Sequence, residues 1–142
     1  TSVAGSTKQV QFNNGGSMTA SANMLFNGTR LHVSNLIVTA TEYNVGNSST
    51  SVTINWNNGN KQKVTMTGNC TFTFTAPTTG VTNLLLRIIQ DATGSRTVTW
   101  PAAVKWPGGV APTLSTAAAS VDIVSCYYNG TSYYCQSGLD FQ

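Results

Sequence analysis

Cys70-Thr71-Phe72-Thr73-Phe74-Thr75 alternates an apolar residue with a threonine at every step. Strict alternation places the apolar side chains on one face of an extended strand and the polar side chains on the other. Pro77 then ends the run, because proline has no N–H to donate to a strand ladder. This stretch therefore predicts a half-buried β-strand rather than a helix.

The same pattern continues immediately before this strand. Residues 52–56 and 61–67 also alternate, and short runs of Asn and Gly separate the three segments. Turns of this composition between short strands are typical of successive antiparallel hairpins. We therefore expect residues 52–75 to form a three-stranded meander whose buried face carries Val, Ile, Trp, Met, Cys and Phe.

Four further strands are predicted downstream, at residues 83–90, 96–100, 120–128 and 131–138. The first of them is apolar on both faces, as in a central strand. Asp91-Ala92-Thr93-Gly94-Ser95 is interpreted as a hairpin loop, and Asn129-Gly130 is a strong hairpin signal. The Pro- and Gly-rich residues 101–116 predict a long irregular loop.

The composition limits the classes of protein to which this chain can belong. Thr, Ser, Asn and Gly supply 63 of the 142 residues, whereas charged residues make up only 8%, against a typical ~25%. The 40% apolar content is too high for a disordered chain, and no apolar run approaches the ~18 residues that span a bilayer. The net charge of +3 is spread along the chain, which argues against nucleic-acid binding.

Candidate catalytic groups are few. His32 is the single histidine, and its alternating run predicts an outward-facing strand residue rather than a general base. The four carboxylates are Glu42, Asp91, Asp122 and Asp140. No motif presents two of them together, which argues against a glycoside hydrolase. A zinc site needs four ligands, and the single histidine lies far from the cysteines in the sequence. We therefore expect a non-enzymatic protein without cofactor or metal.

The three cysteines leave two arrangements of the last hairpin open. Cys126 and Cys135 face each other if the loop between them comprises residues 129–132, and cannot be bridged if it comprises only Asn129-Gly130. The odd total, with Cys70, argues mildly against a disulfide framework. We favour the interpretation that all three are small buried hydrophobic residues.

Aromatic residues beside asparagines raise the alternative of carbohydrate binding. Ring faces offer sugars a flat apolar surface, and amides satisfy sugar hydroxyls. Trp56 is interpreted as a core residue. The candidate ligand-binding residues lie in the Pro-Gly loop and around the last hairpin: Trp106, Tyr127, Tyr128, Tyr133 and Tyr134. If alternate tyrosines pack inward, Trp106 and the exposed pair of tyrosines carry the binding.

Residues 1–40 differ from the rest of the chain. They contain two short hairpin-like segments with few large apolar residues, and an isolated hairpin is marginally stable in water. We therefore expect them to pack on copies of themselves, with candidate trimer contacts at Val10, Phe12, Met24 and Phe26. The chain begins with Thr1 rather than Met, which favours a fragment of a longer protein.

Several motifs resemble those of a known family. Gln9-Val10-Gln11-Phe12-Asn13-Asn14-Gly15-Gly16 and Met24-Leu25-Phe26-Asn27-Gly28-Thr29 are similar to a repeat of bacteriophage tail-fibre and virion proteins. Trp56-Asn57-Asn58-Gly59-Asn60-Lys61-Gln62, Gln90-Asp91-Ala92-Thr93-Gly94-Ser95-Arg96 and Val104-Lys105-Trp106-Pro107-Gly108-Gly109 resemble a β-rich module at the C-terminal ends of such proteins.

The resemblance implies a non-enzymatic, trimeric structural protein on the virion exterior, in contact with other virion proteins. We therefore expect an all-β fold, with a β-sandwich of jelly-roll type at residues 41–142 and a trimerising β-hairpin segment at residues 1–40. The leading hypothesis is host attachment by the tip of a tail fibre or spike, through a cell-surface glycan or protein. The alternatives are a capsid decoration or head-fibre protein without a specific receptor, and a stand-alone carbohydrate-binding module.

Overall fold

The computed structural model of this chain describes residues 9–34, 37–38 and 41–141. These residues form β-strands, loops and two short 3-10 helices, η1 (Trp56–Asn58) and η2 (Pro107–Gly109), so the all-β prediction is confirmed. The chain divides into two compact units between residues 40 and 41. Within the described ranges there is no helix of the length and apolar character needed to cross a membrane.

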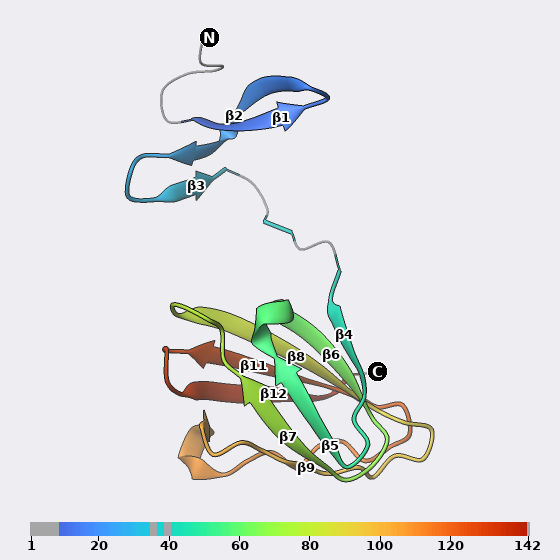
Figure 1. Ribbon diagram of the computed structural model, residues 1–142. Helices are drawn as coiled ribbons and strands as arrows, with labels where there is room; N and C mark the ends of the chain where they lie inside the picture. Colours follow the sequence, from blue (N-terminus) through green and yellow to red (C-terminus); the bar gives the residue numbers. More distant parts are fainter. Residues whose placement is uncertain (1–8, 35–36, 39–40, 142) are drawn as a thin grey trace. The chain divides into compact units, whose positions relative to one another are not determined.

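The first unit is a three-stranded antiparallel sheet of β1 (Gln9–Asn14), β2 (Ser17–Phe26) and β3 (Leu31–Val33) (Figure 1). Gly15 and Gly16 form the turn between β1 and β2, with φ values of 60° and 93°. A two-residue hairpin turn of this kind needs positive φ at both central positions, which glycine adopts without steric cost. The expected hairpins are therefore present, and trimerisation stays a prediction.

The second unit contains two sheets that form two layers (Figure 1). The larger sheet has, in spatial order, the strands β10 (Val104–Lys105), β12 (Tyr133–Phe141), β11 (Val121–Tyr128), β8 (Thr82–Gln90), β6 (Lys61–Met66) and β4 (Tyr43–Asn47). The smaller sheet has the strands β5 (Ser51–Asn55), β7 (Cys70–Thr75) and β9 (Val98–Thr99).

The hydrophobic core lies between these two sheets. Ile54 and Phe72 enter it from the smaller sheet, and Val64, Leu86 and Val124 enter it from the larger one. Each of these side chains is at most 2% exposed. Buried residues alternate with outward residues along β6, β8 and β11, and such alternation gives a sheet one buried and one outer face.

The chain crosses from one sheet to the other at each step from β4 to β10. Each strand from β4 to β7 therefore pairs with the strand two positions later in the chain. These pairs, β4–β6, β5–β7, β6–β8 and β7–β9, are all parallel. This arrangement overturns the predicted meander, because β5 and β7 are neighbours in one sheet while β6 lies in the other. The jelly-roll topology is not confirmed either, since jelly rolls are built from antiparallel strands.

The turns between these strands are corners rather than hairpin loops. After β5 the chain turns through η1 into the other sheet, and the fully buried Gln62 fixes this corner. The Gln62 amide nitrogen donates to the carbonyl oxygens of Asn55 (2.7 Å) and Gly59 (2.8 Å). The alternating pattern could not reveal this, because it records only which side chains face inward and not which strand lies alongside. The same holds for Asp91-Ala92-Thr93-Gly94-Ser95, a corner between β8 and β9 and not the predicted hairpin loop.

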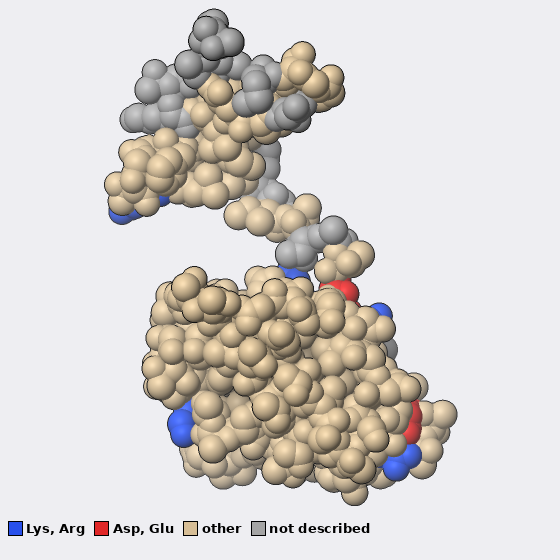
Figure 2. Space-filling view, in the orientation of Figure 1, with Lys and Arg blue, Asp and Glu red and all other residues tan. Residues whose placement is uncertain are grey.

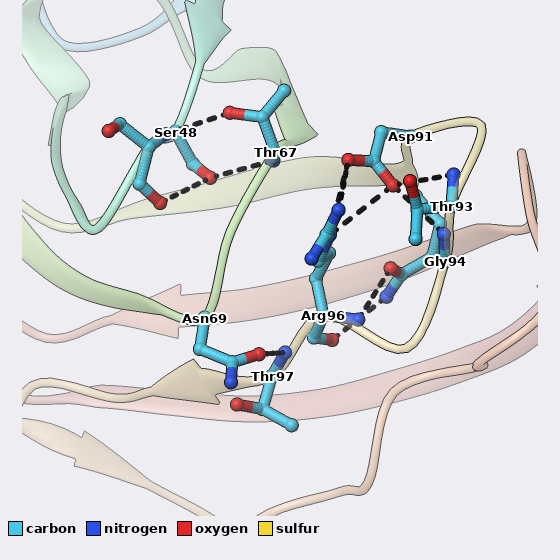
Figure 3. Close-up of polar contacts among 10 residues, drawn as sticks. Ser48, Thr67, Asn69, Asp91, Thr93, Gly94, Arg96 and Thr97 are labelled. Carbon is cyan, nitrogen blue, oxygen red and sulfur yellow. Dashed lines mark hydrogen bonds and ion pairs between the residues drawn. The ribbon is translucent and has the colours of Figure 1, made fainter.

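Short polar side chains tie successive corners together at one end of the second unit (Figure 3). The Thr67 N–H donates to the Ser48 hydroxyl (3.2 Å), and the Ser49 N–H donates to the Thr67 hydroxyl (3.0 Å). The Thr97 N–H donates to Asn69 Oδ1 (3.0 Å). This bond joins the segment between β8 and β9 to the corner between β6 and β7. Ser, Thr and Asn side chains readily satisfy the backbone groups of turns, so these corners account for part of the Ser, Thr and Asn content.

The C-terminal hairpin follows the prediction. β11 and β12 pair antiparallel, and β11 also pairs antiparallel with β8. The irregular loop of residues 101–116 contains the short strand β10 and the helix η2, and β10 pairs parallel with β12. This pairing makes β10 one of the two edge strands of the larger sheet, with β4 at the other edge.

Tyr133 is a core residue whose hydroxyl has no hydrogen-bond partner among the described residues. Its ring packs against those of Phe74 and Tyr128, with centroid distances of 5.2 and 4.6 Å. Burial, together with the nearby Tyr128, raises the pKa of Tyr133 from 10.0 to about 12. The neutral phenol therefore contributes stability that is complete below pH 10 and is lost as the pH rises to about 12.

Tyr133→Phe is expected to keep these ring contacts and to remove the loss of stability at alkaline pH. At neutral pH the free energy of unfolding should stay unchanged or rise by up to about 1 kcal/mol, because an unpaired buried hydroxyl is removed. Between pH 10 and about 12 the wild-type protein should lose roughly 2 to 3 kcal/mol relative to the variant. Urea unfolding across this interval measures the difference, and parallel pH profiles for the two proteins would contradict the prediction.

Candidate functional site

A groove of about 620 Å³ lies on the outer face of the six-stranded sheet. Tyr127 and Tyr134 line it and are 50% and 52% exposed, whereas their chain neighbours Tyr128 and Tyr133 are 5% and 3% exposed. This contrast follows from the strand geometry, because successive side chains point to opposite faces of a sheet. The exposed tyrosines therefore belong to the groove and the buried ones to the core.

The strand register arranges the groove-lining side chains in two adjacent rows, which we call the groove floor. The first row, from β10 to β8, is Lys105, Tyr134, Tyr127 and Asn83. The second row, from β12 to β6, is Gln136, Ser125, Leu85 and Lys61. Paired side chains on one face of a sheet are close neighbours, with Cβ atoms about 4.5–5.5 Å apart. The groove floor is therefore one continuous surface of rings, amides and ammonium groups.

Trp106 borders the groove floor at its β10 end, next to Pro107. Its ring packs edge-on against the ring of Trp100, with centroids 5.0 Å apart. Trp100 in turn contacts Phe72 in the core, with centroids 5.5 Å apart. This support holds the Trp106 ring in place, and a preorganised group loses little conformational entropy when a ligand binds.

The structure brings together three of the five aromatic residues proposed as ligand contacts. Trp106, Tyr127 and Tyr134 line one groove. Tyr128 and Tyr133 do not, because their rings are buried in the core and offer no face to a ligand. Ligand binding by the other three stays a prediction.

Sequence reasoning missed the polar residues of the groove floor. Asn83, Gln136 and the two lysines, Lys61 and Lys105, come from four different strands. No local motif connects them, since only the strand order places them side by side. The single available signal was the outward position of Lys61 in the alternating run 61–67, because Lys105 falls among the residues expected to form an irregular loop.

Cys126 and Cys135 form a disulfide beside the groove. The hairpin loop comprises residues 129–132, and Asn129 Oδ1 accepts two backbone N–H groups of this loop (3.0 and 2.8 Å). The four-residue loop makes Cys126 and Cys135 direct partners across the ladder. The interpretation of three free cysteines is therefore wrong for this pair and holds for the buried Cys70.

Replacing both cysteines, Cys126→Ser with Cys135→Ser, is expected to lower the free energy of unfolding by about 2 to 3 kcal/mol. This is the chain-entropy value for a closed loop of about ten residues. Thermal unfolding with and without a reductant measures it. The reductant should lower the Tm of the wild-type protein and leave the double variant unchanged. An unchanged wild-type Tm after complete reduction, checked by mass spectrometry, would count against the prediction.

Outside the groove, four charged side chains form two ion pairs. Arg87 forms a two-bond ion pair with Glu42 (3.1 and 2.6 Å), and Arg96 pairs with Asp91 at 2.9 Å (Figure 3). In each pair the hydrogen bonds from the arginine are the main cause that lowers the pKa of the carboxyl group. A carboxylate that is stabilised in its ionised form is a poor general acid. These pairs therefore have a structural role.

The remaining candidates for catalysis or metal binding also have structural explanations. Asp122 is buried and accepts hydrogen bonds from Ser115 and from the backbone of Asp140. His32 is exposed on β3, as predicted. Among residues 9–34, 37–38 and 41–141, no group of three or more His, Cys, Asp or Glu side chains could hold a metal ion.

Comparison with known protein families gives the class of this chain. The model of a family described as "Putative phage tail fibre C-terminal domain" matches residues 49–133. The match covers more than half of the chain, including Trp106, Tyr127 and both groove lysines. The chain is a phage tail-fibre structural module, and it belongs to this family.

Membership of this family confirms the resemblance of the second unit to a C-terminal module of phage tail fibres. The repeat-like motifs at residues 9–16 and 24–29 lie outside the match. The family is a structural one and makes the chain a component of the virion. No curated protein and no solved structure matches the chain.

Proposed function

We propose that this tail-fibre module lies on the virion exterior and attaches the virion to its host by binding a cell-surface glycan in the groove. The observation that carries the proposal is that Trp106, Tyr127 and Tyr134, from a loop and two strands, line one depression. Their ring faces suit the apolar faces of sugars, and Asn83 and Gln136 supply amides for sugar hydroxyls. The groove volume of about 620 Å³ lies in the range of small-ligand sites.

The surface of the module also fits a place on the exterior of a virion. On the face drawn in Figure 2, charged side chains of the module occur as isolated patches, and most of that face carries none. Interactions between exposed charges weaken as salt is added, whereas hydrogen bonds between neutral groups depend little on it. The stability of the module should therefore change little between the ionic conditions that a free virion meets.

Binding of the whole chain to intact bacterial cells and to immobilised bacterial surface polysaccharides tests the attachment function. Trp106→Ala and Tyr127→Ala should each weaken binding about tenfold or more, because a well-packed aromatic anchor contributes roughly 2 kcal/mol. Tyr43→Ala is the matched control, since it removes another exposed tyrosine that does not line the groove. A wild-type chain that binds neither cells nor polysaccharides would contradict the proposal.

We propose further that the chain is a homotrimer held together through its N-terminal unit. The register of β2 and β3 pairs Phe26 with Leu31 and Met24 with Val33, which places four apolar side chains on one face. Phe26 and Leu31 are 50% and 60% exposed, and Phe12 on β1 is 46% exposed. Covering such a surface with other copies of the chain would bury apolar area that the single chain leaves in water.

Phe12→Ala and Phe26→Ala are expected to weaken assembly and to leave the second unit intact. Each buried phenylalanine ring contributes about 1.5 to 3 kcal/mol, so the concentration needed for assembly should rise at least about tenfold. Sedimentation equilibrium measures the mass of the assembly. Val81→Ala, which truncates a 61% exposed side chain in the second unit, should not change that mass. An unchanged trimer for both phenylalanine variants would count against this placement.

A further inference from the structure

We infer that the groove selects an acidic polysaccharide, one whose sugars carry carboxylate groups, over a neutral polysaccharide. This inference rests on the proposed function and adds the chemical class of the ligand. Two lysines, Lys61 and Lys105, line the groove, and none of the described residues around it is an acid. A site with two cations and no anion is complementary to a negatively charged ligand.

Neither of these two lysines forms an ion pair within residues 41–141. Residues 41–141 form two ion pairs, and both use an arginine, Arg87 with Glu42 and Arg96 with Asp91. Lys105 Nζ donates one hydrogen bond, to the carbonyl oxygen of Ala102 (3.0 Å), and an ammonium group has three N–H donors. Lys105 therefore keeps both its charge and further donors for a ligand.

The two lysines lie at opposite sides of the groove floor. Lys105 is on β10 and Lys61 on β6, with β12, β11 and β8 between them. Four strand spacings of about 4.8 Å separate their backbones by roughly 19 Å. One charged group cannot contact both ammonium groups over that separation when the side chains extend outward. The arrangement therefore fits a chain of sugars that carries repeated negative charges.

The surface between the lysines suits sugars better than an acidic peptide. Tyr134 and Tyr127 adjoin each other in the first row, next to Asn83, and Leu85 lies in the second row. Flat rings with amides beside them match the apolar faces and hydroxyl groups of sugars. A peptide would instead be expected to pair with the free backbone of an edge strand. Apart from Lys105 on β10, the groove floor lies on strands that are paired on both sides.

The test measures binding of the whole chain to a panel of carboxylated bacterial polysaccharides and to the same polysaccharides after chemical reduction of their carboxyl groups. These paired probes differ in charge and keep the same sugar backbone. The acidic forms should bind more tightly, and the difference should disappear as salt is raised from about 0.01 M to about 1 M, because the Debye length falls from about 30 to 3 Å.

The variant Lys61→Gln with Lys105→Gln should weaken binding of the acidic probes by about 2- to 30-fold, the range for two exposed ion pairs. It should weaken the binding of the reduced probes less than that of the acidic probes, because the reduced probes carry no charge and glutamine keeps N–H donors. Lys63→Gln is the matched control, because Lys63 lies on the same strand as Lys61 and does not line the groove. The control should bind both kinds of probe like the wild-type protein.

The outcomes separate the inference from the proposed function. Equal binding of acidic and reduced probes, with no salt dependence and no effect of the lysine pair, would overturn the inference and leave glycan attachment standing. Binding to intact bacterial cells without binding to any acidic probe would overturn the inference alone. Failure to bind cells and every probe of either kind would overturn both. A change in the sedimenting mass of the lysine double variant would indicate that a second copy of the chain covers this face, and would also overturn the inference.

Discussion

Gly94→Ala is expected to lower the free energy of unfolding by about 3 kcal/mol or more. Gly94 is buried in the corner between β8 and β9, at φ 73°. An L-residue pays about 1 to 2 kcal/mol for this left-handed conformation. A Cβ atom would also overlap the carbonyl oxygen of Thr116 and approach the backbone nitrogen of Ala118 to 2.9 Å. Such overlap with backbone atoms cannot be relieved by a side-chain rotation and adds about 1 to 3 kcal/mol.

Gly80→Ala is the matched control for this substitution. Gly80 also has positive φ (81°), but a Cβ atom there would meet no atom within 4 Å. We expect a loss of about 1 kcal/mol, from the backbone conformation alone. Urea unfolding of both variants, with similar m-values, measures the difference between them. If both variants lost the same stability, the packing of this corner against residues 116–118 would not be the cause.

Asp122→Ala is expected to lower the free energy of unfolding by about 3 to 4 kcal/mol. The Asp122 carboxylate is 1% exposed and accepts three hydrogen bonds. Ser115 donates two, from its N–H (2.8 Å) and its hydroxyl (2.6 Å), and the Asp140 N–H donates the third (2.9 Å). These bonds join the loop before β11 and the end of β12 to one strand. Removing a charged acceptor breaks these bonds, each of which contributes about 1.5 to 3 kcal/mol. Water recovers part of that loss, because Ser115 and Asp140 are not fully buried.

Asp122→Asn gives a graded test of the same network. Asparagine keeps one side-chain oxygen, so it can still accept from the Ser115 hydroxyl and the Asp140 N–H. Its amide nitrogen would face the Ser115 N–H, and two donors cannot bond each other. We therefore expect roughly half of the loss in the free energy of unfolding that the alanine variant shows. Urea unfolding measures both variants. An alanine variant within about 0.5 kcal/mol of the wild-type protein, the usual effect of a surface substitution, would show that this network is unimportant.

Individual strands were well predicted because alternation reports burial directly. Cys70 and Phe72 are buried and Thr71 and Thr73 exposed, as their alternation indicates. The hairpin around Asn129-Gly130 was predicted because its two strands are adjacent in sequence and its turn residues are specific. The pairing of the parallel strands was not predicted. Paired strands such as β5 and β7 are about 20 residues apart in the sequence, and no hairpin turn connects them.

The candidate site was predicted in part for the same reason. The alternation of the last hairpin made one tyrosine pair outward and the other inward, and the structure identifies Tyr127 and Tyr134 as the outward pair. Lys61 and Leu85 could not be associated with them from the sequence, because they join the groove floor only through the parallel pairing of β6 with β8. The disulfide was not predicted, because the sequence left the length of the hairpin loop open.

The amino-acid sequence by itself determined that this chain is all-β, where most of its strands lie, which side chains they bury, and the family to which the chain belongs. Only the tertiary structure decided which strands pair, that the pairing is mostly parallel in the second unit, and which polar residues join the aromatic ones in the groove. The physical reason is that burial is recorded locally, by alternation along a strand. Strand order depends instead on how the polar corners stack, through hydrogen bonds such as that from Thr97 to Asn69, and these join residues far apart in the chain.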